Sequence, residues 1–204
     1  MQDEQARSGR PLAGATFIAS APRAGAFPPD DRPEVAFAGR SNAGKSSALN
    51  TLCGQRKLAR TSKTPGRTQA INFFAAGDGR LVDLPGYGFA RVPPKVRAAW
   101  QGLVEGYLAR RAGLRGVVLL MDARHPLTTF DRQLLDWGAA RSLPFHVLLT
   151  KADKLGHGAR TATLRDVARA LPEHGVQLFS ATHRIGLDEA RARIEAWLED
   201  NDCK

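Results

Sequence analysis

The residues best suited to chemistry form one glycine-rich stretch of the sequence. It runs Gly39, Arg40, Ser41, Asn42, Ala43, Gly44, Lys45, Ser46 and Ser47. Glycine allows successive backbone N–H groups to turn inward onto a polyphosphate, while a lysine and a hydroxyl at this spacing reach its outer oxygens and Mg²⁺. The stretch therefore predicts a nucleoside triphosphate site, with Lys45 on the phosphates and Ser46 on the metal, and leaves the base open.

A second motif follows the apolar residues 81–82 and consists of Asp83, Leu84, Pro85 and Gly86. An aspartate at the end of a strand can hold Mg²⁺ through water, and the N–H of the glycine behind it can contact the γ-phosphate. Taken alone, this tetrapeptide is typical of an ordinary turn. The phosphate loop upstream favours the metal-binding interpretation.

Two further motifs concern the base. Thr150, Lys151 and Asp153 end an apolar run, and the Asp153 carboxylate can accept from both guanine N1–H and the exocyclic amine while the Lys151 stem covers the ring. Adenine offers no such donor pair, so this motif predicts GTP and GDP rather than ATP. Residues Ser180, Ala181 and Thr182 could present an N–H to guanine O6, although a serine-rich turn explains them equally well.

The elements that must position these motifs follow from the hydrophobic pattern. Apolar runs of strand length alternate with segments that have helical spacing, which indicates an α/β fold with right-handed crossovers and helices on both faces. The pattern predicts a mostly parallel, six-stranded sheet. Expected strands lie at 35–38, 70–76, 80–84, 116–122, 144–150 and 176–179, and expected helices begin near 47, 93, 130, 161 and 187.

The chain organisation expected from composition is one folded domain at 34–200, preceded by an N-terminal extension and linker at 1–33 and followed by a tail at 201–204. Residues 16–19 are either a short edge strand or a segment packed on the domain. Glycine and proline interrupt the weakly apolar residues 12–21, so a signal peptide is not expected. No apolar run reaches the ~20 residues of a membrane span.

The charge and the cysteine content further limit the class of protein to which this chain could belong. Thirty Lys and Arg against 20 Asp and Glu give a net charge of +10, for which a polyanion such as nucleic acid is the usual partner, although a solvated basic surface gives the same count. Cys53 and Cys203 are too few and too far apart for a disulfide framework. We expect unpaired thiols and a cytoplasmic location.

With these motifs in order, the sequence resembles the EngB family of ribosome-biogenesis GTP-binding proteins, within the TrmE-Era-EngA group. The resemblance rests on residues 36–47, 62–69, 71–74 and 83–88. It implies a P-loop NTPase with a Ras-like G domain, acting as a monomer in large-subunit assembly and needed for normal cell division. The implied partners are a ribosomal subunit precursor and its rRNA.

The same resemblance assigns two switch segments, at 60–69 and from Gly86 to about 92. Gly66, Arg67 and Thr68 would then contact the nucleotide, and the Thr68 hydroxyl would join Ser46 on Mg²⁺. Thr150 stands where many GTPases have asparagine, which predicts a weaker tie to the phosphate loop.

Catalysis would rest on Lys45, Thr68 and Asn42. The residue after Gly86 is Tyr87, which cannot orient a water as a glutamine does, so slow intrinsic hydrolysis is expected. Resemblance to the TrmE-like GTPases makes Asn42 a K⁺ ligand that would compensate; the alternative is a residue that shapes the loop.

A basic cluster is the expected rRNA contact. It comprises Arg91, Lys95, Arg97, Arg110, Arg111 and Arg115. Solvated helix faces are the alternative for these charges. Two other protein classes also stay open, namely a P-loop kinase and a GTP-dependent switch that binds protein effectors.

Overall fold

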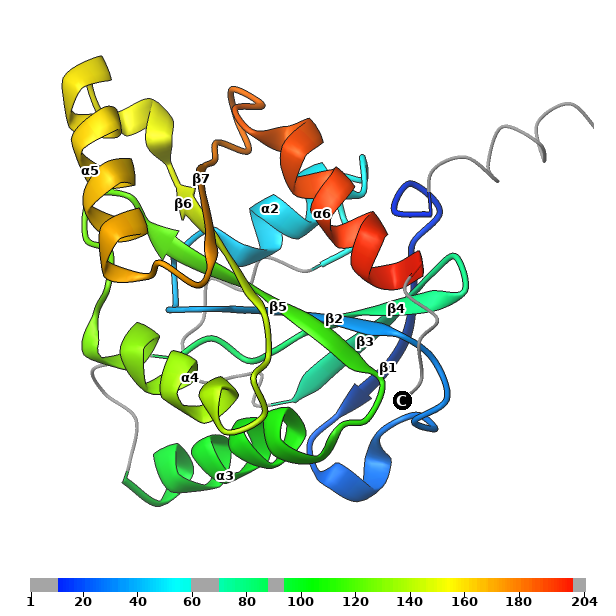
Figure 1. Ribbon diagram of the computed structural model, residues 1–204. Helices are drawn as coiled ribbons and strands as arrows, with labels where there is room; N and C mark the ends of the chain where they lie inside the picture. The colour runs from blue at the N-terminus through cyan, green and yellow to red at the C-terminus, as the bar shows by residue number, and fades with distance from the viewer. Residues whose placement is uncertain (1–10, 60–69, 88–93, 200–204) are drawn as a thin grey trace, which may run out of the picture.

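The computed structural model describes residues 11–59, 70–87 and 94–199, apart from the side chains of 94–97. In that part of the chain a seven-stranded sheet has the order β1-β3-β4-β2-β5-β6-β7 (Figure 1). The strands are β1 (Thr16–Ala21), β2 (Glu34–Gly39), β3 (Ile71–Ala76), β4 (Gly79–Asp83), β5 (Leu114–Asp122), β6 (Phe145–Thr150) and β7 (Gly175–Leu178). From β4 to β7 all neighbouring strands are parallel, whereas β3 is antiparallel to β4 and to β1. The predicted α/β fold is confirmed.

The strand count of six was wrong, because β1 is a seventh strand. Its register with β3 runs from Thr16 opposite Ala75 to Ala21 opposite Ile71. Phe17 packs edge-on against Phe74 at 5.8 Å, yet it is 58% exposed. An edge strand held largely by backbone hydrogen bonds needs no alternation of apolar and polar residues, so the pattern that marked the other strands is absent here.

Helices cover both faces of the sheet. They are α2 (Lys45–Leu52), α3 (Pro94–Arg110), α4 (Thr129–Ala139), α5 (His157–Ala170) and α6 (Leu187–Glu199), with short 3₁₀ turns η1 (Ala24–Ala26) and η2 (Ala152–Lys154). One core packs α3, α4 and α5 against the sheet, and a second core packs α2 and α6 against the other face (Figure 1). Among the described residues no helix has the length and hydrophobicity to cross a membrane.

The parallel strands bring the predicted motifs to one edge. Phe37 of β2 lies opposite Asp83 of β4, Gly39 lies opposite Leu120 of β5, and Asp122 of β5 lies opposite Thr150 of β6. The carboxyl ends of parallel strands are where open α/β sheets bind ligands.

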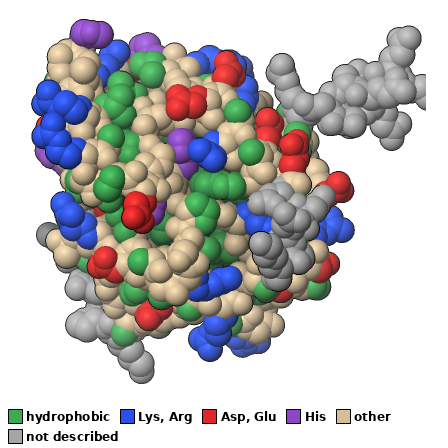
Figure 2. All heavy atoms as spheres, viewed as in Figure 1, with side chains coloured by type: hydrophobic (Ala, Val, Ile, Leu, Met, Phe, Trp, Pro, Cys, Tyr) green, Lys and Arg blue, Asp and Glu red, His purple; other side chains and the backbone are tan. Residues whose placement is uncertain are grey.

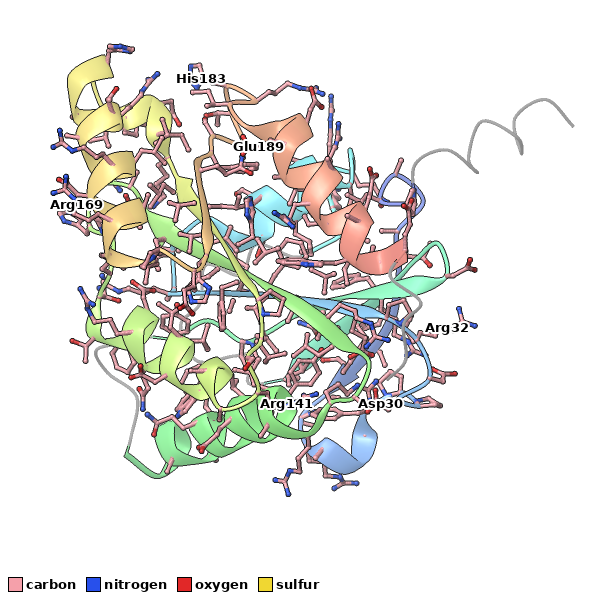
Figure 3. The ribbon with its side chains drawn as sticks, viewed as in Figure 1. Asp30, Arg32, Arg141, Arg169, His183 and Glu189 are labelled. Carbon is pink, nitrogen blue, oxygen red and sulfur yellow. The ribbon has the colours of Figure 1, made fainter. Side chains whose placement is uncertain are left out.

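The opposite edge of the sheet holds a buried ion cluster. Glu34 is fully buried and accepts from Arg111 Nη2 at 2.6 Å and Tyr107 Oη at 2.9 Å. Asp30 accepts from the backbone N–H groups of residues 112 and 113, both at 2.7 Å, which ties the segment before β2 to the end of α3 (Figure 3). Arg111 was expected on an RNA-facing surface; this was wrong, because its guanidinium neutralises a buried carboxylate.

Candidate nucleotide-binding site

The phosphate loop joins β2 to α2. At Gly39 a Cβ would lie 2.8 Å from the Leu120 carbonyl oxygen, so the loop can leave β2 this close to β5 only through glycine. Gly44, directly before α2, has φ of +89°, in the left-handed region. A glycine here carries no side chain to cap the helix, so no capping side chain competes with an anion for the first turn of α2.

The residues predicted for phosphate and metal face one another across the site. Lys45 Nζ forms an ion pair with Asp83 Oδ1, and both side chains are 11% exposed. Lys45 begins α2, next to Ser46, and Asp83 is the last residue of β4. A hydroxyl and a carboxylate beside a lysine form a donor set that suits Mg²⁺ bound together with phosphate oxygens. No cluster of three or more His, Cys, Asp or Glu side chains within the described ranges could hold a metal without a nucleotide.

The base motif is fastened to the phosphate loop by two side chains. Thr150 Oγ1 lies 2.6 Å from the Ala43 carbonyl oxygen and 3.1 Å from that of Met121. Lys151 Nζ donates to the Asn42 carbonyl at 2.6 Å. The Thr150 hydroxyl thus reaches the phosphate loop directly.

Asp153 is prepared as an acceptor. Its side chain is only 6% exposed, and Ser180 Oγ donates to Oδ1 at 2.6 Å. That hydrogen bond is the main cause that lowers the Asp153 pKa below its ordinary range, with Lys154 adding to it. His183, which lies beyond β7 at the edge of the molecule in Figure 3, is 3.7 Å from Oδ2. An ionised Asp153 has the chemistry to accept from a base with two neighbouring N–H donors.

The remaining predicted residues are distributed around this centre. Arg40 is exposed, whereas Leu84 is buried and its N–H donates to the Phe37 carbonyl at 3.0 Å. Ala181 is half-buried, and Ser47, near the start of α2, is exposed. Three predicted nucleotide contacts, Gly66, Arg67 and Thr68, lie outside the described residues, as do residues 88–92 of the second switch and Arg91.

Asp122 and Arg124 are two residues of the site that the sequence motifs did not predict. Asp122 Oδ2 accepts from Lys151 Nζ at 2.9 Å, and the Arg124 guanidinium bonds both carboxylate oxygens at 2.9 and 2.7 Å. Arg124, followed by Lys151, holds the Asp122 pKa well below its usual range. The signal was available, because Asp122 ends a buried strand as Asp83 does.

A polar cavity of about 210 Å³ lies beside the phosphate loop. Residues 40–43 form one wall, and the connection from β5 to α4 forms another. Asn42 lines this cavity with φ of +65°, a conformation that asparagine tolerates better than most residues. The loop-shaping interpretation of Asn42 thus has a direct structural basis.

The Tyr87 side chain is buried, and its hydroxyl is already bound to a carboxylate. Its side chain is 3% exposed, and its hydroxyl donates to Asp131 Oδ1 at 2.7 Å. The ring packs near Trp100 and Phe130, at 5.8 and 6.0 Å between centroids. A phenol held in this way cannot orient an attacking water.

Comparisons with known proteins agree with this geometry. Residues 34–151 match the family described as 50S ribosome-binding GTPase. A protein of Thiobacillus denitrificans named probable GTP-binding protein EngB is 58% identical over 174 residues, covering 83% of this chain and 84% of that protein.

Two solved structures share the fold. A crystal structure of a probable GTP-binding protein engB superposes with TM-score 0.68 at 21% identity, covering 82% of this chain and all of that one. Era in complex with MgGDPNP and nucleotides 1506–1542 of 16S ribosomal RNA superposes with TM-score 0.66 at 21% identity, covering 83% of this chain and 58% of that one.

Proposed function

Because this chain belongs to the EngB family of GTP-binding proteins and is a GTPase, we propose that it acts as a nucleotide switch in assembly of the large ribosomal subunit. By the same reasoning, normal cell growth and division depend on it. The single observation that carries the switch is the placement of Lys45, Asp83 and Asp153 at the carboxyl ends of the parallel strands β2, β4 and β6 or just after them, with Lys45 paired to Asp83. These residues can bind the phosphates, the metal and the base of one GTP molecule.

The residues present fit Mg²⁺, with Ser46, Asp83 through water, and Thr68 as its proposed ligands. Bound Mg²⁺ neutralises charge on the β- and γ-phosphates. In this structure the Lys45 ammonium is paired with Asp83, so nucleotide binding requires Lys45 to exchange the carboxylate for phosphate oxygens. Hydrolysis is proposed to be slow, since the buried Tyr87 phenol offers no group to orient water.

Potassium is the proposed second cation, with the Asn42 amide as its ligand beside the phosphates. Support comes from the position of Asn42, which lines the cavity next to the loop. The backbone carbonyl of Asn42 accepts from the Lys151 ammonium, whose charge repels a second cation, so the side-chain amide is the group proposed to serve K⁺. This leaves the cation role and the loop-shaping role separable by substitution.

The proposed partner is rRNA on a subunit precursor in the cytoplasm. Support comes from the net charge of +10 and from the fold shared with Era, which was solved with a 16S rRNA fragment. Figure 2 shows Lys and Arg side chains gathered over α5, where Arg169 points outward in Figure 3. Arg110, at the end of α3, is also exposed. Phosphate contacts from such residues would make binding fall steeply with salt.

Competition between GTP and ATP tests the nucleotide assignment first. Preference for GTP is expected, whereas preference for ATP would favour a P-loop kinase and end the proposal. Sedimentation with purified ribosomal subunits, in GDP and in a non-hydrolysable GTP analogue, then tests the partner. Co-sedimentation that depends on the nucleotide is expected.

Charge reversal then locates the RNA contact. Arg110→Glu on α3 should be compared with Arg165→Glu and Arg169→Glu on α5, because all three are exposed and change charge equally. We expect charge reversal on at least one of these two helices to abolish binding to the ribosomal subunit. Binding unchanged by all three, and absent from rRNA alone, would instead indicate a switch that binds proteins.

A further inference from the structure

The two tyrosines of this chain are both buried and both donate to a buried carboxylate. Tyr87 Oη lies 2.7 Å from Asp131 Oδ1, and Tyr107 Oη lies 2.9 Å from Glu34 Oε2. All four residues are at most 3% exposed. Burial, followed by the neighbouring carboxylate, raises the pKa of both phenols, so each stays protonated and donates. The two pairs are chemically alike, but only Tyr87 is next to the nucleotide site.

Asp131 gives the Tyr87 hydrogen bond a fixed anchor. Its second oxygen, Oδ2, accepts from the Thr128 N–H at 2.8 Å and from Thr128 Oγ1 at 2.7 Å. The Asp131 N–H in turn donates to Thr128 Oγ1 at 3.4 Å, which completes the capping box that begins α4. Because one carboxylate serves both the helix cap and the phenol, Tyr87 is held in a set position relative to α4.

The backbone on either side of Gly86 is also held. The Ser41 N–H donates to the Tyr87 carbonyl at 2.7 Å, and Trp100 Nε1 donates to the Pro85 carbonyl at 3.2 Å. A Cβ on Gly86 would stand 3.5 Å from the Ser41 Cα and N atoms, so this residue lies against the phosphate loop. Gly86 is therefore fixed between two held neighbours. Pro85 is tied to α3, and Tyr87 is tied to both the phosphate loop and α4.

We propose that Tyr87 is a positioning residue for the γ-phosphate: its hydrogen bond to Asp131 holds the Gly86 N–H where only a triphosphate can use it. The inference rests on the proposed function, in which this N–H contacts the γ-phosphate. GDP has no γ-phosphate, so the contact raises affinity for GTP alone. Tyr87 thus sets how strongly the protein distinguishes GTP from GDP, rather than how strongly it binds either.

The test measures affinity for GDP and for a non-hydrolysable GTP analogue in the Tyr87→Phe variant. A net buried hydrogen bond corresponds to about a five- to tenfold change in an equilibrium constant. We expect a loss of about that size for the GTP analogue, with GDP affinity unchanged. Equal losses for both nucleotides, or no loss for either, would overturn the proposal.

Tyr107→Phe is the matched control. It removes the same atom from an equally buried phenol–carboxylate pair at the opposite edge of the sheet. Both variants should lower thermal stability, but Tyr107→Phe should leave both nucleotide affinities unchanged. A shift in the GTP-to-GDP ratio with Tyr107→Phe would show that the ratio responds to general loosening, and would also overturn the proposal.

Substitutions at Asp131 separate positioning from helix capping. Asp131→Asn keeps an oxygen that accepts from Tyr87 but replaces the acceptor for the Thr128 N–H. Stability should therefore fall, while the ratio of GTP to GDP affinity should stay unchanged. Asp131→Ala removes both contacts and should reproduce the ratio of Tyr87→Phe. The double variant Tyr87→Phe/Asp131→Ala should show no further loss of affinity for the GTP analogue, because both changes break the same hydrogen bond. Additive losses would contradict the proposal.

Failure of this inference is distinguishable from failure of the proposed function. If the wild-type protein binds ATP as well as GTP, the nucleotide assignment itself fails. If the wild type prefers GTP, and Tyr87→Phe keeps the same ratio of GTP to GDP affinity, only the positioning role fails.

Discussion

The Thr150 hydroxyl lies 2.6 Å from the Ala43 carbonyl and joins two residues that are 107 positions apart in the sequence. One belongs to the base motif and the other to the phosphate loop. A second hydrogen bond runs from the Lys151 ammonium to the Asn42 carbonyl, and together the two bonds hold the two halves of the nucleotide site in place. Their spacing is therefore set before a nucleotide binds.

Replacing Thr150 by valine tests the Thr150 hydrogen bond, because valine keeps the shape and removes the hydroxyl. The Ala43 carbonyl loses its partner, and we expect affinity for GTP and GDP to fall together by about five- to tenfold. Competition binding with both nucleotides measures it. Thr150→Ser, which retains the hydroxyl, is the control; an unchanged affinity in the valine variant would show that this hydrogen bond is dispensable.

Asp153→Asn should change base preference rather than abolish binding. The carboxylate accepts from two guanine donors, whereas an amide offers one acceptor and one donor. Xanthine has an oxygen in place of the exocyclic amine and so matches the amide. We expect GTP affinity to fall by at least about tenfold and XTP binding to appear. Failure to bind XTP in a folded variant would argue against direct contact between Asp153 and the base.

Asn42→Gly separates the two roles of Asn42. Glycine adopts the same φ of +65° at no steric cost and retains the carbonyl that Lys151 uses, so only the amide is lost. We expect wild-type hydrolysis to be faster in K⁺ than in Na⁺ at equal ionic strength, and the variant to lose that difference while its GDP affinity stays the same. A wild-type rate that is no faster in K⁺ would remove the cation role.

The Asp122 contacts should contribute stability that acid removes. The folded pKa lies below the ordinary value of 3.8, so the contribution is fully present above about pH 4 and is lost as the pH falls through the folded value. Asp122→Asn should therefore lower the urea midpoint at pH 7 and flatten its fall below pH 4. Asp78→Asn, in the exposed turn between β3 and β4, matches the change in net charge. An equally steep fall in Asp122→Asn would count against this assignment.

Cys53 should be inert toward thiol reagents in the native protein. It is 1% exposed at the end of α2, and burial raises its pKa to about 12, so almost no thiolate exists at pH 8. In a Cys203→Ser background, we expect the native protein to react far more slowly than the same protein in urea. Equal rates would show that this end of α2 opens readily.

Much of this architecture is local and could be predicted from residue types. The apolar runs marked the sheet from β2 to β7 and the helices between its strands, because burial on both faces leaves a pattern within a few residues. Gly39, Gly44 and Lys45 marked the phosphate loop for the same reason: the spacing that bends a backbone around phosphate is written in consecutive positions.

Other features depend on which strands become neighbours. Strand β1 is held mainly by pairing with β3, so its own residues gave no clear signal. Arg111 looked like a surface charge until the fold placed it on the buried Glu34. In the same way, Lys45 meets Asp83 because the sheet sets β2 beside β4.

The sequence by itself therefore determined the kind of ligand, since the groups that bind phosphate and guanine occupy short motifs. Only the tertiary structure decided how these motifs are joined. The Thr150–Ala43 and Tyr87–Asp131 hydrogen bonds connect residues 107 and 44 positions apart. Such contacts exist because parallel strands linked by crossovers end at one edge of the sheet, and strand order is a property of the whole fold.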